Sequence, residues 1–261
     1  MGATADNRGV SIESQADLDG LIRVGRVVAL AIAAMRRSVR PGMSTQDLDD
    51  VGARVFRRHG ARSAPQLAYD FPGVNCISLN DEAVHGVPSP RRFITRGDLV
   101  KIDVTAELDG YMADAAVTVE AGSWTPAKQR LLRVAVCALG RGLRAARAGA
   151  TGESVGAAIG SEVARRGYRV IPELGGHGIG RTIHEAPSIP NYPDPHATVA
   201  LTEGLVVTVE PIITAGIGRV RRSPDGWTLP TTDGQLSAHV EHTIVVTAER
   251  PLVLTRLSAS F

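Results

Sequence analysis

Internal repetition is the feature that most constrains this chain. The segment RPGMSTQDLDDVGARVFRRHG, which begins at Arg40, aligns with RAGATGESVGAAIGSEVARRG, which begins at Arg147, with matching Arg, Gly, Ser/Thr and apolar positions. The same offset of 107 residues pairs Arg26-Val27 with Arg133-Val134 in the preceding segments. Self-similarity over a long period is the signature of a repeated structural unit. We therefore expect two related halves.

Both copies of the repeat have the pattern of a helix that follows another helix. Ser44 and Thr151 are favourable N-caps, and apolar residues follow them at intervals of three to four. Gly60 and Gly167 stand where a C-terminal glycine cap belongs.

Carried forward, the same offset pairs two acidic residues inside apolar runs. RGDLVKIDV aligns with TEGLVVTVEP, so that Asp103 falls on Glu210. The runs 99–104 and 205–214 are rich in β-branched residues and predict buried strands. Either carboxylate alone could belong to a structural salt bridge. Two at equivalent places indicate a bound cation, because a buried charge is costly unless it is compensated.

A hairpin follows the first of these strands. Asp109-Gly110 favours a two-residue type I′ turn, which places Asp114 opposite Thr105. Thr105 shares a sheet face with Asp103, so the two aspartates become diagonal neighbours within about 8 Å. A slip of one residue would send Asp114 to the other face.

The second half contains a counterpart of this hairpin. DAAVTV, which starts at Asp114, resembles EHTIVV, which starts at Glu241, and a longer Gly-, Pro- and Asp-rich loop at 217–234 accounts for the larger offset. Glu241 is therefore expected to be the fourth carboxylate of the site.

Histidines complete the pattern. VHGVPS and IHEAPS pair His85 with His184, and a structural pair is the alternative interpretation. His177 lies in GGHGIG, where glycines let the backbone bend closely around the imidazole, although an ordinary loop histidine would look the same. Four buried carboxylates and one imidazole suit two divalent ions of Mn, Fe, Co or Zn, which would activate a bridging water for hydrolysis. The predicted metal ligands are Asp103, Asp114, His177, Glu210 and Glu241.

The motifs IDVTAELDGYMAD, GHGIG, TVEP and EHTIVV together resemble the bacterial single-domain type I methionine aminopeptidases, within the pita-bread metallopeptidase family. The resemblance runs from residue 13 to Leu254. It implies an α/β (α+β) pita-bread fold in which two pseudo-two-fold related α/β halves surround a central antiparallel sheet. It also implies removal of the N-terminal methionine from nascent proteins and peptides with a small second residue.

The resemblance further assigns roles to individual residues. Asp103 would bind one ion, His177 and Glu210 the other, while Asp114 and Glu241 bridge them. Glu210 would also shuttle a proton, and His85 and His184 would orient the scissile peptide. The resemblance assigns four residues to the methionine pocket, and ordinary core packing is the alternative interpretation of each: Tyr69, Phe71, Cys76 and Trp227.

This sequence departs from the family pattern near the pocket. The loop AYDFPGVNC is about one residue shorter than usual, Ile183 replaces the common Phe, and His239 stands where Gln is usual. These changes leave the metal motifs intact and put the pocket's specificity in question. Two rivals are a proline-specific peptidase of the same fold, against which the short region before Asp103 argues, and an inactive scaffold relative, against which the full ligand set argues.

Composition limits the remaining possibilities. A net charge of +2 with interspersed acids and bases gives no basic stripe for nucleic acid. The apolar run 21–35 is too short and too charged to span a bilayer, the N-terminus lacks a signal peptide, and Cys76 and Cys137 lack the spacing of a metal or disulfide motif. We expect a cytoplasmic monomer with a flexible tail at 1–12 and one catalytic domain at 13–261, formed by half-repeats at about 13–122 and 123–254. Any ribosome association would use the body of the enzyme.

Overall fold

The computed structural model describes residues 12–257. The predicted tail at 1–12 therefore lies, except for Ile12, outside the described residues. Each helix begins after a Ser or Thr whose hydroxyl accepts a hydrogen bond from a backbone N–H in the first turn, which satisfies a donor that the helix leaves free. The helices are α1 (Gln15–Ser38), α2 (Thr45–His59), α3 (Ala64–Tyr69), α4 (Pro126–Ala145) and α5 (Gly152–Arg165).

The two predicted N-caps, Ser44 and Thr151, are confirmed, and both form a capping box. The repeat is visible beyond the helices as well. Isolated bridges join Ser44 to Phe93 and Thr151 to Ala200, and the partners are again 107 residues apart. Equivalent helix–turn units thus begin the two halves.

The named strands pair antiparallel in every described pairing, and four sheets result. In the first half, β4 pairs with β1, β2 and β5. In the second, the orders are β14-β13-β9-β7-β8 and β12-β10-β6, while β11 pairs with β3 across the halves. The strands are β1 (Arg62–Ser63), β2 (Cys76–Leu79), β3 (Glu82–Val84), β4 (Leu99–Leu108), β5 (Tyr111–Glu120), β6 (Arg169–Val170), β7 (Gly176–Gly178), β8 (Glu185–Ile189), β9 (Val206–Val209), β10 (Ile212–Thr214), β11 (Leu229–Pro230), β12 (Ser237–His239), β13 (His242–Val245) and β14 (Leu252–Val253).

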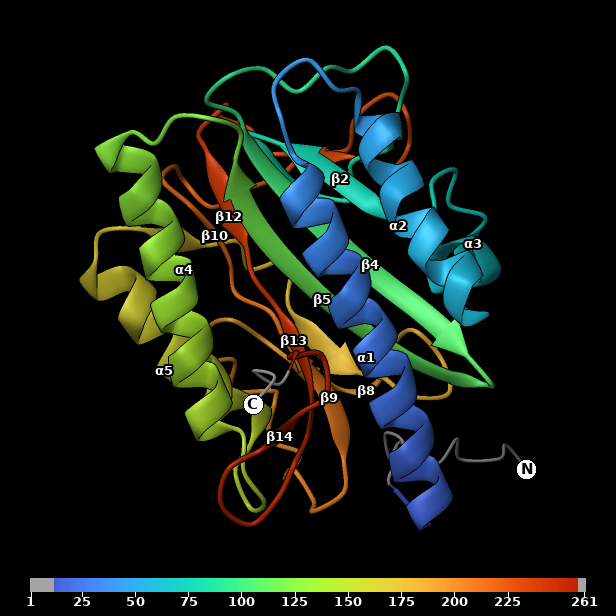
Figure 1. Ribbon diagram of the computed structural model, residues 1–261. Coiled ribbons are helices and arrows are strands. Elements are labelled where there is room, and N and C mark those ends of the chain that lie inside the picture. Colours follow the sequence, from blue (N-terminus) through green and yellow to red (C-terminus); the bar gives the residue numbers. More distant parts are fainter. Residues whose placement is uncertain (1–11, 258–261) are drawn as a thin grey trace.

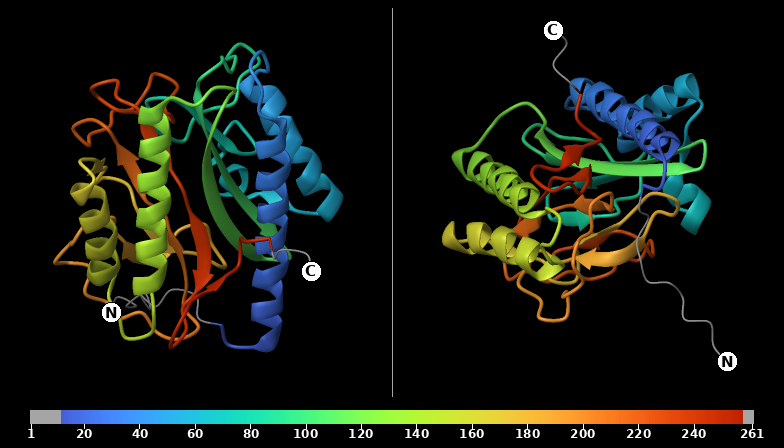
Figure 2. Two further views of the ribbon diagram at one scale, coloured as in Figure 1. Left: turned by 60° about the vertical axis from the view of Figure 1, so that its left-hand side comes forward. Right: turned by 90° about the horizontal axis from the view of Figure 1, so that it is seen from below.

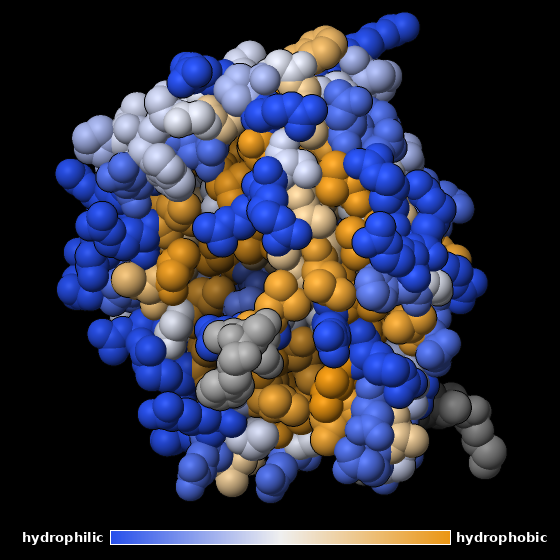
Figure 3. Space-filling model, in the orientation of Figure 1, coloured by the Kyte–Doolittle hydropathy of each residue, from blue (hydrophilic) through white to orange (hydrophobic). Residues whose placement is uncertain are grey.

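Helices cover the outer face of the strands. Helix α1 lies over β4 and β5 with α2 beside it, near β1 and β2, and α4 and α5 form the equivalent pair over the second half (Figures 1 and 2). One large core cluster draws on residues 24–121, and another on residues 131–246 together with Leu99. Apolar surface is exposed in the valley between α1 and α4, flanked by polar surface (Figure 3). The mixed α/β architecture with antiparallel sheets agrees with the sequence-based prediction.

The predicted continuous strand at 205–214 is wrong in one respect. It is broken at Glu210 and Pro211 into β9 and β10. Proline has no N–H for the ladder. On the paired segment, the backbone N–H of Glu241 does not bond to the neighbouring strand of its own sheet. It donates to the Ala116 carbonyl of β5 at 2.9 Å. The hydrogen bond from Glu241 to Ala116, which the interruption makes possible, therefore connects the two halves.

The predicted loop at 217–234 also contains a strand. Residues of β11 pair with β3, and Leu229 lies opposite Val84. This pairing brings the loop of the second half against the segment of the first half that contains His85. Among residues 12–257, none of the helices combines the length and the hydrophobicity that crossing a membrane requires.

Candidate metal centre

One cavity of about 210 Å³ collects the chemistry that the sequence predicted. Strands and loops from both halves form its walls. Its lining includes the five predicted metal ligands and both predicted substrate-facing histidines: Asp103, Asp114, His177, Glu210, Glu241, His85 and His184.

The β4–β5 hairpin positions the first two carboxylates. Asp109 and Gly110 both have positive φ, as a type I′ turn requires. Thr105 pairs with Asp114 across the hairpin, so the predicted register is confirmed. Asp103 and Asp114 therefore lie diagonally on one face, and both point into the cavity.

The interrupted strands position the second two carboxylates. The pairings β9–β13 and β10–β12 keep a single register across the break, which places Glu210 opposite Glu241. Both side chains are almost completely buried. Thr208 donates a hydrogen bond from its hydroxyl to Glu210 Oε1 at 2.8 Å, and the second Glu210 oxygen remains directed toward the cavity.

His177 enters the cavity from β7, where glycines allow close packing. A Cβ at Gly176 would lie 2.4 Å from the Thr208 carbonyl oxygen, and one at Gly178 would lie 2.3 Å from that of Ala186. His177 Nε2 lies 3.4 Å from Glu210 Oε1. The close packing of β7 between β8 and β9 therefore requires glycine on both sides of His177, in addition to the backbone bend that glycine was predicted to permit there.

Buried charge dominates the electrostatics of the cavity. Burial raises the pKa values of Asp103, Glu210 and Glu241 well above their usual range, and neighbouring carboxylates raise them further. Burial also raises the pKa of Asp114 to about 6. Burial lowers the pKa of His177 to about 3, so its imidazole is neutral near neutral pH. The carboxylates repel one another and the imidazole offers a lone pair, which is the environment of a cation site.

The donor atoms fit divalent ions. Asp114 Oδ1 and Glu241 Oε1 are buried without a hydrogen-bond partner, which costs free energy unless an ion or water satisfies them. Carboxylate and imidazole donors without a thiolate suit Mn, Fe, Co or Zn. Two groups of convergent ligand atoms share Glu241: one is Asp114, His177 and Glu241, and the other is Glu210, His239 and Glu241.

His239 is the residue that sequence reasoning did not assign to the site. It lines the cavity, its side chain is 3% exposed, and burial lowers its pKa to about 3. A usable signal was present in the sequence: His239 precedes Glu241 by two residues, and side chains two apart in an extended segment share a face.

His85 and His184 both line the cavity. His85 has φ +58°, a left-handed conformation that is uncommon for a residue other than glycine. Burial lowers its pKa to about 4. His184 packs against His177 with ring centroids 4.2 Å apart, and its Nδ1 lies 2.6 Å from the Tyr69 hydroxyl.

The predicted pocket residues approach the site from both halves. The rings of Phe71 and Trp227 meet edge to face with centroids 5.2 Å apart. Cys76 is buried on β2 directly opposite Asp103. Thr228, next to Trp227, donates a hydrogen bond to the carbonyl of His85 at 3.4 Å. The lining of the carboxylate cavity includes none of the four predicted pocket residues; Tyr69 contacts His184, and Cys76 lies opposite Asp103.

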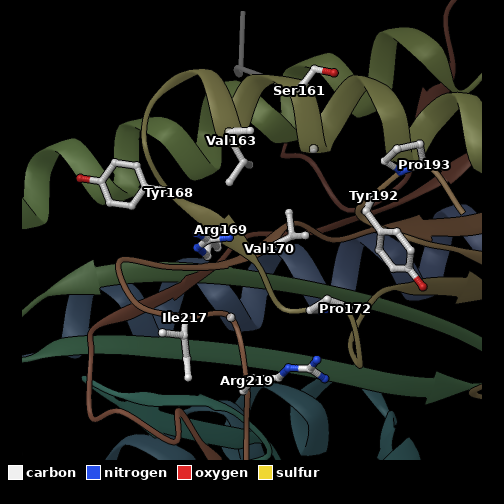
Figure 4. Close-up of a pocket in the computed structure, with 13 residues that line it drawn as sticks. Ser161, Val163, Tyr168, Arg169, Val170, Pro172, Tyr192, Pro193, Ile217 and Arg219 are labelled. Atoms are coloured by element: carbon white, nitrogen blue, oxygen red, sulfur yellow. The ribbon is translucent and has the colours of Figure 1, made fainter.

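A larger cavity of about 490 Å³ lies between α5, β6 and the loop at 217–219 (Figure 4). Tyr168, Val170, Tyr192 and Ile217 contribute apolar surface, and Arg169 and Arg219 also line it. Its 13 lining residues include no carboxylate, histidine or cysteine, so it lacks the groups that hydrolysis or metal binding requires.

Comparisons with known proteins agree with this geometry. Residues 19–248 match the model of metallopeptidase family M24. Methionine aminopeptidase 2 of Bacillus subtilis is 43% identical over 247 residues, which cover 94% of this chain and 99% of the relative. Methionine aminopeptidase of Aquifex aeolicus is 34% identical, over 95% of this chain and 99% of the relative.

Solved structures extend the comparison. Methionine aminopeptidase from Thermotoga maritima has a TM-score of 0.92 at 32% identity, over 95% of this chain and 100% of that chain. Prolidase from Pyrococcus furiosus shares the fold with a TM-score of 0.77 at 22% identity, over 95% of this chain and 66% of that chain. The chain belongs to metallopeptidase family M24 and, within it, to the methionine aminopeptidases.

Proposed function

We propose that this metal-dependent peptide hydrolase uses two divalent ions to remove N-terminal methionine from peptides whose second residue is small. The observation that carries the proposal is the single cavity in which four carboxylates and His177 converge while buried oxygens of Asp114 and Glu241 have no partner. The ions would be held by the predicted set, with Asp114 and Glu241 shared between them.

When bound, the ions supply Lewis-acid polarisation of the scissile carbonyl and a water molecule of lowered pKa. Glu210 is suited to take up a proton, because burial and the charge of Asp114 raise its pKa well above the usual range. The same carboxylate can then give the proton to the leaving amine. Thr208 keeps one Glu210 oxygen in place during this exchange.

His85 and His184 are suited to orient the peptide. Burial lowers the pKa of both, so each is neutral near neutral pH and can donate one hydrogen bond to a substrate carbonyl. The apolar wall of Phe71 and Trp227, with Cys76 and Tyr69, suits an unbranched thioether side chain. We further propose that the natural substrates are nascent polypeptides and that the enzyme acts as a cytoplasmic monomer, with any ribosome contact made by its catalytic body.

Peptide hydrolysis by metal-stripped protein, reconstituted separately with Mn, Fe, Co and Zn, tests the proposal. We expect free methionine from Met-Ala-Ser, strict dependence on added metal, and much less release from Met-Leu-Ser. Cleavage of Ala-Pro-Ala alone would instead identify a proline-specific peptidase. Two bound ions without hydrolysis of any of the three peptides would favour a scaffold role.

A further inference from the structure

His239 stands at the end of β12 with its backbone held on both sides. Its N–H donates to the Thr118 hydroxyl at 2.9 Å, and that hydroxyl donates to the His239 carbonyl at 2.7 Å. Ile212 lies opposite it in the β10–β12 pairing. The backbone is therefore fixed, and the ring is directed into the carboxylate cavity.

The ring itself has no partner. Both His239 Nδ1 and His239 Nε2 are buried without a hydrogen bond. A buried polar group left in this way is unfavourable, and native structures avoid it by supplying a partner. Among residues 12–257, neither nitrogen has a hydrogen-bond partner, whereas the carboxylates of Glu210 and Glu241 face Nε2.

The distances to these carboxylates suit a shared ion better than a hydrogen bond. Nε2 lies 3.4 Å from Glu241 Oε2 and 3.7 Å from Glu210 Oε2. N–H···O hydrogen bonds span about 2.7–3.2 Å. Ligand atoms at about 2.1 Å from a tetrahedral ion lie about 3.4 Å from one another.

We propose that His239 is a direct metal ligand that forms one ion position together with Glu210 and Glu241. This inference rests on the proposed metal-dependent function. His239 would add a second imidazole to the predicted ligand set, beside the ion that Glu210 helps to hold. Glu241 also belongs to the other group of convergent ligand atoms, Asp114, His177 and Glu241, as expected of a shared ligand.

A second imidazole changes which metals the centre prefers. Imidazole suits Zn, Cu, Fe and Ni, whereas carboxylate-only positions suit Mn and Mg. His239 therefore raises affinity for Zn more than for Mn. We expect His239→Gln to weaken Zn binding at least about tenfold while Mn binding changes less, as measured by competition with a chelating dye.

Nuclear magnetic resonance gives a direct test. The full-length protein, with nitrogen-15 in its histidines, is loaded with cadmium-113, and imidazole nitrogens bonded to the ion show one-bond splitting. We expect two split imidazoles in the wild type. His239→Gln should remove one, and His177→Gln the other. His196→Gln, which changes an exposed histidine, is the matched control and should remove neither.

The wild-type count decides the question even where a variant fails to fold. One split imidazole, lost only in His177→Gln, would contradict the role of His239 and leave the proposed function intact. A shifted but unsplit His239 resonance would indicate a hydrogen bond and would also contradict the inference. A wild type that takes up neither cadmium nor zinc would contradict both proposals.

Discussion

Two imidazoles in the cavity are oriented by groups that lie outside the carboxylate set. His177 Nδ1 lies 2.9 Å from the Gly178 carbonyl oxygen, which can only accept, so Nδ1 carries the proton and Nε2 is free for an ion. A Tyr69 hydroxyl that donates to His184 Nδ1 leaves the His184 proton on Nε2. These tautomers are the ones that the proposed roles require, cation binding by His177 and donation to a substrate by His184.

Removal of the Tyr69 hydroxyl should test this second arrangement. In Tyr69→Phe the orientation and tautomer of His184 are no longer fixed, so we expect kcat/KM for Met-Ala-Ser to fall about tenfold, as is usual when a hydrogen bond that orients a functional histidine is removed. Tyr69 is 45% exposed, so the melting temperature should not change. Tyr168→Phe, which removes a hydroxyl beside the other cavity, is the control and should keep full activity. Equal activity in both variants would contradict the tautomer argument.

His85 has a left-handed backbone conformation, so two substitutions that both remove its ring should differ in backbone strain. Asn tolerates this conformation, whereas Ala is disfavoured there by about 1–2 kcal/mol. We expect His85→Asn to keep the wild-type melting temperature and His85→Ala to lower it, while both lose most activity. Thermal denaturation and peptide hydrolysis, measured on the same preparations, separate the two effects. Full activity in His85→Asn would exclude a substrate-facing role.

Sequence reasoning located the site residues that lie in the internal repeat or beside a recognisable turn. Asp103 followed from the repeat that aligns it with Glu210, and the diagonal placement of Asp114 followed from Asp109-Gly110, which fixes the register of the hairpin. It did not assign His239 to the site: the two-residue spacing from Glu241 was a usable signal, but the burial and the unpartnered state of the ring are not visible in the sequence. Such properties arise only from tertiary packing.

At the scale of elements, Glu162 joins α5 to α4. Its side chain is 4% exposed and lies near three guanidinium groups, those of Arg141, Arg165 and Arg166. The hydrogen bond from Arg165, followed by the charges of the arginines, lowers the pKa of Glu162. An acid with a lowered pKa in the folded state stabilises it above the unfolded pKa, and this stability is lost as pH falls through the folded pKa.

Glu162→Gln should therefore destabilise the protein in a pH-dependent way. The arginines are half exposed, so solvent screening limits the loss to about 1 kcal/mol at pH 7. That corresponds to a fall of about 2–4 °C in melting temperature. Below pH 4.5 the difference from the wild type should shrink as Glu162 is protonated. The exposed Glu203→Gln is the matched control, and a constant difference at every pH would contradict the ion-pair explanation.

The sequence pattern predicted the helix boundaries better than the strand boundaries in the run 205–214. Each predicted helix start carried its own cap within a few residues, as at Ser44 and Thr151. The run 205–214 is rich in β-branched residues, but Pro211 interrupts it, and on the paired segment the N–H of Glu241 bonds to Ala116 instead. The second of these causes involves residues far apart in the sequence, which local patterns cannot reveal.

At the scale of the molecule, the halves are joined by hydrogen bonds beside the carboxylates. Thr243 accepts from the backbone N–H of Asp114 at 2.8 Å and donates to its carbonyl at 2.7 Å. The ammonium of Lys101, 1% exposed, donates to the carbonyl of Ser237 in the other half at 3.2 Å. The metal centre and the contact between halves therefore share strands, so an ion that satisfies the carboxylates also stabilises the junction.

Metal binding should consequently raise the stability of the whole chain. An ion at 100 times its Kd adds about 2.7 kcal/mol, or about 5–10 °C in melting temperature for a chain of this size. Asp114→Asn removes one of the mutually repelling charges, so we expect its metal-free form to melt above the metal-free wild type while the rise on adding Zn is largely lost. Calorimetry with and without Zn measures both quantities, and Asp50→Asn, at an exposed position of α2, is the control that should behave as the wild type. An Asp114→Asn variant with the full Zn-dependent rise would show that the Asp114 carboxylate is not a ligand, because a lost ligand must weaken the coupling between metal and fold.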